Sequence, residues 1–175
     1  MDLLDRMLHH DQWATTMYLE KSRDLSDAQL DQTFDIGQTT LRDTFDHLIA
    51  TINFWTQQMI GQPAPPDREG TPSIVELIER HNRNYALFAD AARKAQDEGR
   101  LDDTFVDHFG YTQSIGSTIP HVILHNALHR SEARHILERL GVADLWDGDP
   151  QEWEHMTGRI DATRRASDGG QAAGD

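Results

Sequence analysis

The sequence contains no cysteine, so the protein can form no disulfide bond, no thiolate metal site and no cysteine nucleophile. Basic residues are also scarce, because 16 lysines and arginines stand against 30 acidic residues and leave a formal net charge of −14. Nucleic acids and anionic membranes attract positively charged surfaces. The charge balance therefore argues against both as binding partners and favours a soluble protein.

Long apolar runs are missing as well. No stretch approaches the roughly 20 apolar residues that a transmembrane helix requires. The opening residues, MDLLDRMLHHDQW, carry acidic side chains where a secretory signal peptide would carry basic ones followed by an apolar run. We therefore expect no membrane partner and a cytoplasmic location.

The chain of 175 residues is long enough for one domain with a substantial core. It contains no internal repeat, no glycine-rich phosphate loop and no GxSxG motif. We expect a single domain over residues 1–160. The last part of the chain, RRASDGGQAAGD, has almost no apolar side chain, so residues 161–175 are expected to form a disordered tail.

Four segments carry apolar residues at helical spacing and have recognisable boundaries. They are residues 2–22, 40–60, 73–99 and 120–141. The second and third begin with the capping boxes TLRD and SIVE, and the fourth is expected to begin at Pro120, since proline favours the first turn. Four amphipathic helices predict an all-α fold, a four-helix bundle with its functional site in the core.

Two segments outside these helices are less regular. Between the third and fourth helices, Phe105-Val106 and Phe109-Gly-Tyr111 could form a short extended pair or an ordered loop. After Gly141, two tryptophans are expected to fold back over the end of the bundle.

Two histidines, His125 and His129, stand four residues apart in the fourth helical segment. This spacing places them roughly 40° apart around the helix axis and about 6 Å apart along it, at the apolar face. One helix can supply two ligands to one metal ion in this way. Surface histidines and hydrogen-bonded core histidines also occur at this spacing, and the chain has 10 histidines.

A third ligand has to come from another helix, and His47 is the candidate. It lies about 100° from Leu48, on the helix flank that it shares with Thr44, Thr51 and Phe54. Periodicity alone therefore leaves both a metal site and ordinary core packing open.

Three stretches together resemble the DinB/YfiT-like family: HHDQWATTMYLEKSRDLSDAQL, TLRDTFDHLIATINFW and HVILHNALHRSEARHILERLG. The resemblance covers about residues 3–142. It implies a four-helix bundle, often a homodimer, with a divalent metal held by three histidines. Matched position by position, those ligands fall on His47, His125 and His129, and Arg130 follows the last of them.

The chain departs from the family pattern beside the ligands. The family often shows a further histidine, then glycine and glutamine, where this chain has Leu128, Ser131 and Glu132. The ligands are retained, but their surroundings are expected to differ. Some relatives replace one histidine ligand with glutamate, which keeps Glu132 as an alternative ligand.

Three neutral imidazoles would leave a divalent ion its full charge and an open position, as in catalytic metal sites. Such an ion can activate water or bind a thiolate. Imidazole does not select sharply among metals, so we expect zinc or nickel. The family is similar to bacillithiol and mycothiol S-transferases, a maleylpyruvate isomerase and proteins described as metal-dependent hydrolases.

The resemblance therefore implies a metal-dependent thiol S-transferase or hydrolase that acts on a small molecule, with a low-molecular-weight thiol as a candidate substrate. Two alternatives belong to other classes. One is a metal-binding stress or sensor bundle without a specific reaction, and the other is an interaction module whose histidines only pack.

Other residues near the ligands have two interpretations each. Glu132 could act as a general base or be a polar rim residue. Arg130 could bind an anionic substrate, pair with an acidic side chain at a helix end, or cap an interface. Asp43 could orient the ring of His47, but a role in the helix cap is favoured.

The remaining histidines and two tryptophans receive simpler assignments. His121 is expected at the rim of the site, and Trp13 and Trp55 in the core or in a pocket wall. The other histidines are expected at the surface; they are His9, His10, His81, His108, His135 and His155.

Overall fold

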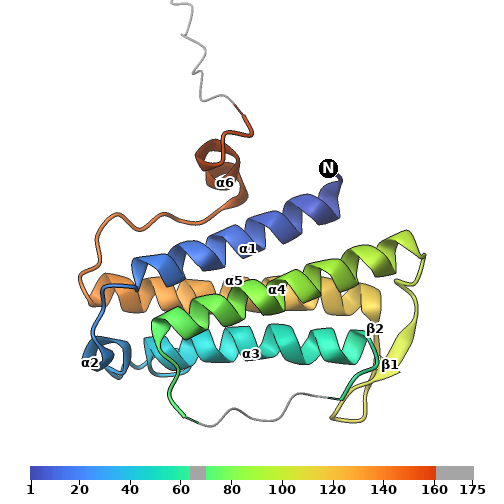
Figure 1. Ribbon diagram of the computed structural model, residues 1–175, viewed down its shortest axis with the longest axis horizontal. Coiled ribbons are helices and arrows are strands. Elements are labelled where there is room, and N and C mark those ends of the chain that lie inside the picture. Colours follow the sequence, from blue (N-terminus) through green and yellow to red (C-terminus); the bar gives the residue numbers. More distant parts are fainter. Residues whose placement is uncertain (64–69, 161–175) are drawn as a thin grey trace, which may run out of the picture.

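Four long helices form the body of the computed structural model, which describes residues 1–63 and 70–160 (Figure 1). They are α1 (Leu3–Lys21), α3 (Leu41–Met59), α4 (Ile74–Asp97) and α5 (Ile115–Arg139). The predicted all-α bundle is confirmed, and the first three helices end within a few residues of their predicted bounds. The predicted disordered tail, residues 161–175, lies outside the described residues.

The four helices pack in a ring, because α3 contacts both α4 and α5 while α1 contacts the same two helices from the other side. Their apolar faces enclose one core. Among its fully buried large side chains are Tyr18, Tyr85, Phe45, Phe88, Leu48 and Ile52. Helices α3 and α5 run antiparallel, as the colours of Figure 1 show. The line along which these two helices meet is called the α3–α5 seam below.

The predicted helix starts at Thr40 and Ser73 are confirmed. The Thr40 side chain accepts a hydrogen bond from the backbone N–H of Asp43 at 3.0 Å, and the Asp43 carboxylate accepts the Thr40 hydroxyl at 2.8 Å. Ser73 and Glu76 form a complete capping box at the start of α4. Both caps satisfy amide groups that the first helical turn leaves without partners.

The predicted start of the fourth helix at Pro120 is wrong. Helix α5 begins five residues earlier at Ile115, where the Ser114 side chain accepts a hydrogen bond from the Ser117 amide at 3.1 Å. Pro120 lies inside the helix, and it has no N–H to donate to the carbonyl of Gly116. The serine cap sets the boundary, and the helix tolerates one missing bond near its start.

The segment between α4 and α5 contains a short hairpin. Strand β1 (Thr104–Val106) pairs antiparallel with β2 (Thr112–Ser114). The extended pair is therefore confirmed, but its second strand follows Phe109–Tyr111 instead of containing it. Those residues form the turn, because the Asp107 carboxylate accepts the backbone N–H groups of Phe109 and Tyr111 at 2.9 Å each.

Two short helices complete the described chain. Helix α2 (Asp27–Leu30) was not predicted, because its four residues are too few to show a periodicity. Helix α6 (Pro150–Met156) lies beside α1, as Figure 1 shows. Its Trp153 side chain is buried. Trp153 thus returns to the bundle as expected, although to the side of α1, while Trp146 stays 42% exposed. None of the helices in the described ranges has the length and apolar character that crossing a membrane requires.

Candidate metal centre

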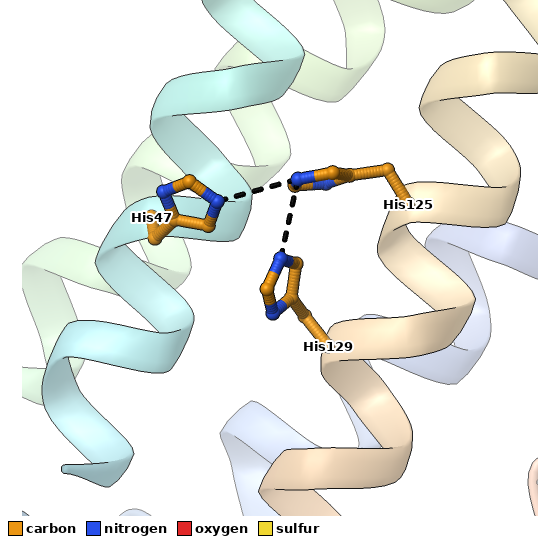
Figure 2. Close-up of side chains that lie close together, drawn as sticks. All are labelled: His47, His125 and His129. Atoms are coloured by element: carbon orange, nitrogen blue, oxygen red, sulfur yellow. Dashed lines mark hydrogen bonds between the residues drawn. The ribbon is translucent and has the colours of Figure 1, made fainter. Parts of the chain in front are cut away.

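Three histidine rings meet across the α3–α5 seam (Figure 2). The Nε2 atom of His125 lies 3.2 Å from Nε2 of His47 and 3.2 Å from Nε2 of His129. One ligand atom from each ring lies within 4.8 Å of the others. The structure therefore brings together the three residues that the sequence analysis named.

The local sequence explains this convergence. His125 and His129 are one helical turn apart in α5, so their rings lie next to each other, edge to face, along one flank of the helix. His47 lies in α3, which packs against α5. His129 is buried, whereas His47 and His125 are half-buried, so the cluster lies at the edge of the core. This position combines a rigid scaffold with access from one side.

The spacing of the nitrogens fits a tetrahedral metal ion. Zinc binds imidazole nitrogen at about 2.0–2.1 Å, so two ligands at the tetrahedral angle are about 3.3 Å apart. The two 3.2 Å separations agree with that value. Three imidazoles are also a donor set that zinc, nickel and similar ions accept. The residues present therefore fit a divalent ion.

Glu132 fixes the tautomer of His129. Its carboxylate oxygen Oε2 lies 2.6 Å from Nδ1 of His129. An ionised carboxylate only accepts hydrogen bonds, so Nδ1 carries the proton. In the neutral ring, Nε2 then presents its lone pair to the other two histidines, which is the form that a metal ligand requires.

Gly37, in the loop before α3, makes room for that carboxylate. A Cβ atom at this position would lie 2.6 Å from the Glu132 Cδ atom, closer than such atoms approach. The backbone of Gly37 has a φ of +50°, which favours glycine as well. The loop thus places its backbone against the carboxylate that holds the His129 ring, a contact that the helix pattern did not reveal.

Burial keeps two of the histidines neutral. Desolvation lowers the pKa of His125 to about 4, and the neighbouring rings of His129 and His47 add to the effect. Desolvation also lowers the pKa of His47, and the adjacent His129 contributes. At neutral pH both rings are unprotonated, which is the state that binds a metal.

Glu132 is not part of the ligand cluster. The ligand atoms found within the described chain come from the three histidines, and the Glu132 carboxylate faces the far nitrogen of His129. Asp43 takes part in the N-cap of α3, as favoured above, through its hydrogen bonds with Thr40. His121 lies at the rim, where its ring centroid is 6.0 Å from that of His125.

Arg130 faces α1 and not the histidine cluster. Its guanidinium forms a buried ion pair with Asp11 and donates to the Thr15 hydroxyl at 3.1 Å. Asp11 also accepts hydrogen bonds from Tyr85 at 2.9 Å and from Asn126 at 2.7 Å. Arg130 thus has an acidic partner, but Asp11 lies in the middle of α1 and not at a helix end as expected. The role of Arg130 as an anion-binding residue stays a prediction.

Sequence reasoning missed Asp11, although a signal was present. Asp11 stands three residues after Leu8 and three before Ala14, on the apolar face of α1, and its exposed fraction is 0%. A carboxylate at such a position has to find partners in the core. Its spacing therefore predicts a buried polar network, but not which residues complete it.

The surface assignment of His81 is wrong. His81 is completely buried in α4, and its Nε2 atom lies 3.4 Å from the backbone oxygen of Gln12. Burial lowers the pKa of His81 to about 4. The sequence did indicate this burial, because the spacing of Ile78 and Tyr85 places His81 on the apolar stripe of the helix.

The other histidines assigned to the surface are only partly exposed as a group. His108, His135 and His155 are exposed, while His9 and His10 are half-buried. Trp13 and Trp55 are half-buried too.

Residues 10–133 match the family model of the DinB superfamily. The chain belongs to this superfamily. The match covers more than half of the sequence and includes all three histidines of the cluster. No curated protein matches the chain. Membership in the DinB superfamily agrees with the helical bundle and with a metal-binding histidine site, and leaves the reaction open.

Proposed function

We propose that this DinB-superfamily protein is a divalent-metal-dependent enzyme, a thiol S-transferase or related hydrolase that acts on a small molecule. One observation carries the proposal: ligand nitrogens of three histidines from two helices lie within 4.8 Å of one another, with His125 Nε2 at 3.2 Å from each of the other two, and a carboxylate sets the tautomer of one ring. A closed structural site would use a fourth protein ligand, whereas this cluster comprises three.

Zinc or nickel is the proposed ion, with His47, His125 and His129 as its ligands. When bound, a divalent ion with three neutral ligands acts as a Lewis acid that lowers the pKa of a thiol or water molecule at its open position. The absence of cysteine from the chain means that any thiolate in the reaction belongs to a substrate. A low-molecular-weight thiol is therefore the proposed partner in the transferase case.

The chain's own residues prepare the site. Glu132 holds the proton on Nδ1 of His129 and thereby orients the ring. The general-base role expected for Glu132 from the sequence is retained here as part of the proposal. Arg130 acts on the site through the position of α5, since its guanidinium is paired with Asp11.

Metal analysis tests the first half of the proposal. The protein would be purified without an affinity tag, reconstituted with zinc or nickel, and analysed beside His47→Ala and His125→Ala. We expect about one ion per wild-type chain and a loss in both variants, because each removes one of three ligands. His135→Ala removes an exposed histidine of α5, the helix that carries His125, and is the matched control. A wild type that stays empty, or a His47→Ala variant that keeps its metal, contradicts the proposed site.

Turnover tests the second half. The metal-loaded protein would be screened with low-molecular-weight thiols plus an electrophile, and separately with small esters and amides. The enzyme proposal predicts activity that disappears in His125→Ala together with the metal. A protein that binds metal stoichiometrically but turns over none of these compounds would favour the metal-binding stress or sensor bundle.

The resemblance also leads us to propose a homodimer. Light scattering would measure the molar mass in solution and test this.

A further inference from the structure

A cavity of about 400 Å³ lies at the hairpin end of the α3–α5 seam. Its walls include Trp55 of α3, His121 of α5, and Phe109 and Tyr111 of the hairpin turn. A volume in this range is typical of sites for small molecules. The three aromatic side chains and His121 are called the aromatic subsite below.

The turn holds its two aromatic side chains out of the core. Phe109 is 70% exposed and Tyr111 is 68% exposed, which is unusual for side chains of this size. Their backbone positions are nevertheless fixed, because the buried Asp107 carboxylate accepts both of their amide groups and the Gln113 side-chain amide at 3.1 Å. A rigid turn that presents aromatic rings to solvent is prepared to receive an apolar group.

The same hydrogen bonds define the polarity of the cavity. Asp107 is the charged side chain in its wall, and three donors already occupy that carboxylate. The hydroxyl of Thr118 donates to the Ser114 carbonyl at 2.8 Å. The described wall contains no arginine or lysine that could bind an anionic group. Its chemistry therefore suits an uncharged, flat group better than a carboxylate or phosphate.

His121 connects the cavity to the metal centre. Its ring centroid lies 5.2 Å from that of Trp55 and 6.0 Å from that of His125. His121 also precedes His125 by one helical turn, so the His121 side of the cavity wall is one turn away from the ligand cluster along the seam. A small molecule can therefore place one end at the histidines and the other end among the aromatic side chains.

We propose that the aromatic subsite binds a planar, uncharged aromatic ring of the substrate while the substrate's reactive group lies at His47, His125 and His129. This inference rests on the proposed function and adds the class of substrate to it. Stacked and edge-on contacts with Trp55, Phe109 and Tyr111 supply the affinity. The wall's lack of a free positive charge selects against anionic rings.

Two hydroxamates test the subsite, because benzohydroxamate and acetohydroxamate carry the same metal-binding group and differ in the phenyl ring. Calorimetric titration of the zinc-loaded wild type should give at least about tenfold tighter binding of benzohydroxamate. In the double variant Phe109→Ser and Tyr111→Ser, that preference should fall to about twofold or less, with acetohydroxamate binding unchanged. Both residues are largely exposed, so the variant should fold. Leu124→Ser, which removes an equally exposed apolar side chain of α5 outside the cavity, is the matched control and should keep the preference.

A ring-only probe separates this inference from the proposed function. Benzamide, titrated into metal-free protein, should shift the NMR amide signals of residues 107–121 in the wild type and not in the double variant. A protein that binds no zinc but shows these shifts would refute the metal-dependent function and retain the subsite. An equal affinity for both hydroxamates, a preference that survives in the double variant, or an absence of these shifts would overturn the subsite. A double variant that changes only the oligomeric state would overturn it too and identify the turn as a contact between chains.

Discussion

Asp11 in α1 and Arg130 in α5 form an ion pair in the interior of the bundle, with side-chain exposures of 0% and 8%. Asn126, one turn before Arg130, donates to the same carboxylate. Both α5 residues directly follow a histidine of the cluster. One orientation of α5 about its axis therefore does two things. It gives the buried Asp11 carboxylate its hydrogen-bond partners, and it points His125 and His129 at His47.

Removal of Asp11 should be strongly destabilising. The variant Asp11→Ala leaves the buried guanidinium of Arg130 without its charge partner, which costs about 3–5 kcal/mol in comparable pairs. Urea denaturation would measure the free energy of unfolding. Asp35→Ala is the control, because it removes the exposed partner of Arg139 and should have little effect. Equal losses in the two variants would show that the Asp11–Arg130 pair adds nothing to stability.

Loss of the Glu132 carboxylate should weaken metal binding. In Glu132→Ala, Nδ1 of His129 loses its acceptor, so neither the tautomer nor the ring orientation is fixed, and the zinc affinity should fall by about 10- to 100-fold. Competition with a chromophoric chelator would measure the change. Glu132→Gln retains a side-chain oxygen that can accept the bond and should recover part of the affinity. Glu138→Ala, an exposed acid of the same helix, should leave the affinity unchanged.

A methyl group at Gly37 should act on the metal site through Glu132. The Cβ of Gly37→Ala would collide with the Glu132 carboxylate and push it from His129. We expect weaker zinc binding together with a stability loss of about 1 kcal/mol from the positive φ. Gly61→Ala is a matched control, since Gly61 also has a positive φ but no atom within 4 Å of an added Cβ. If Gly37→Ala lowers zinc affinity no more than Gly61→Ala does, the contact with Glu132 has no role in the site.

Stability should fall at mildly acidic pH because of His81. Its pKa is about 4 in the folded protein and about 6.5 in the unfolded chain, so the unfolded state binds the proton more readily. The cost appears as the pH falls below about 6.5 and approaches about 3 kcal/mol near pH 4. Nearby Asp11 favours the protonated ring and Arg130 opposes it, while the Gln12 carbonyl accepts from it.

The variant His81→Leu isolates this effect, since it lacks the titrating ring. The free energy of unfolding would be measured for wild type and variant from pH 8 to pH 4, with a chelator present to keep both proteins free of metal. The difference between the two proteins is the quantity of interest. Contributions from the other histidines cancel in that difference. A difference that does not change with pH would mean that His81 is solvated or paired when protonated.

The sequence predicted most of the bundle because its signals are local. Apolar periodicity and the two caps at Thr40 and Ser73 located three helices closely. The histidine pair in α5 was likewise local, since a spacing of four within a helix fixes the relative direction of two side chains. His47 required the family resemblance, because periodicity does not determine which flank of α3 faces α5.

The missed features depend on contacts between distant parts of the chain. The partners of Asp11 come from α4 and α5, and no spacing within α1 identifies them. Gly37 and Glu132 lie 95 residues apart in the sequence, so their contact is visible only in three dimensions. The misplaced start of α5 has a different cause, because Pro120 and Ser114 are competing boundary signals and the cap prevails.

The first turn of α5 is tied to the segment that carries the hairpin. The amide of Ile115 donates to the Asp103 carbonyl at 3.0 Å, and the amide of Gly116 donates to the Leu101 carbonyl at 2.8 Å. Pro120 has no N–H, so it forms no helical hydrogen bond to the first turn of α5. The hairpin and the start of α5 therefore form one mechanical unit. A molecule held by the aromatic turn is therefore anchored to the same backbone unit that carries His121, so its distance from the histidines of α5 is set by the fold itself.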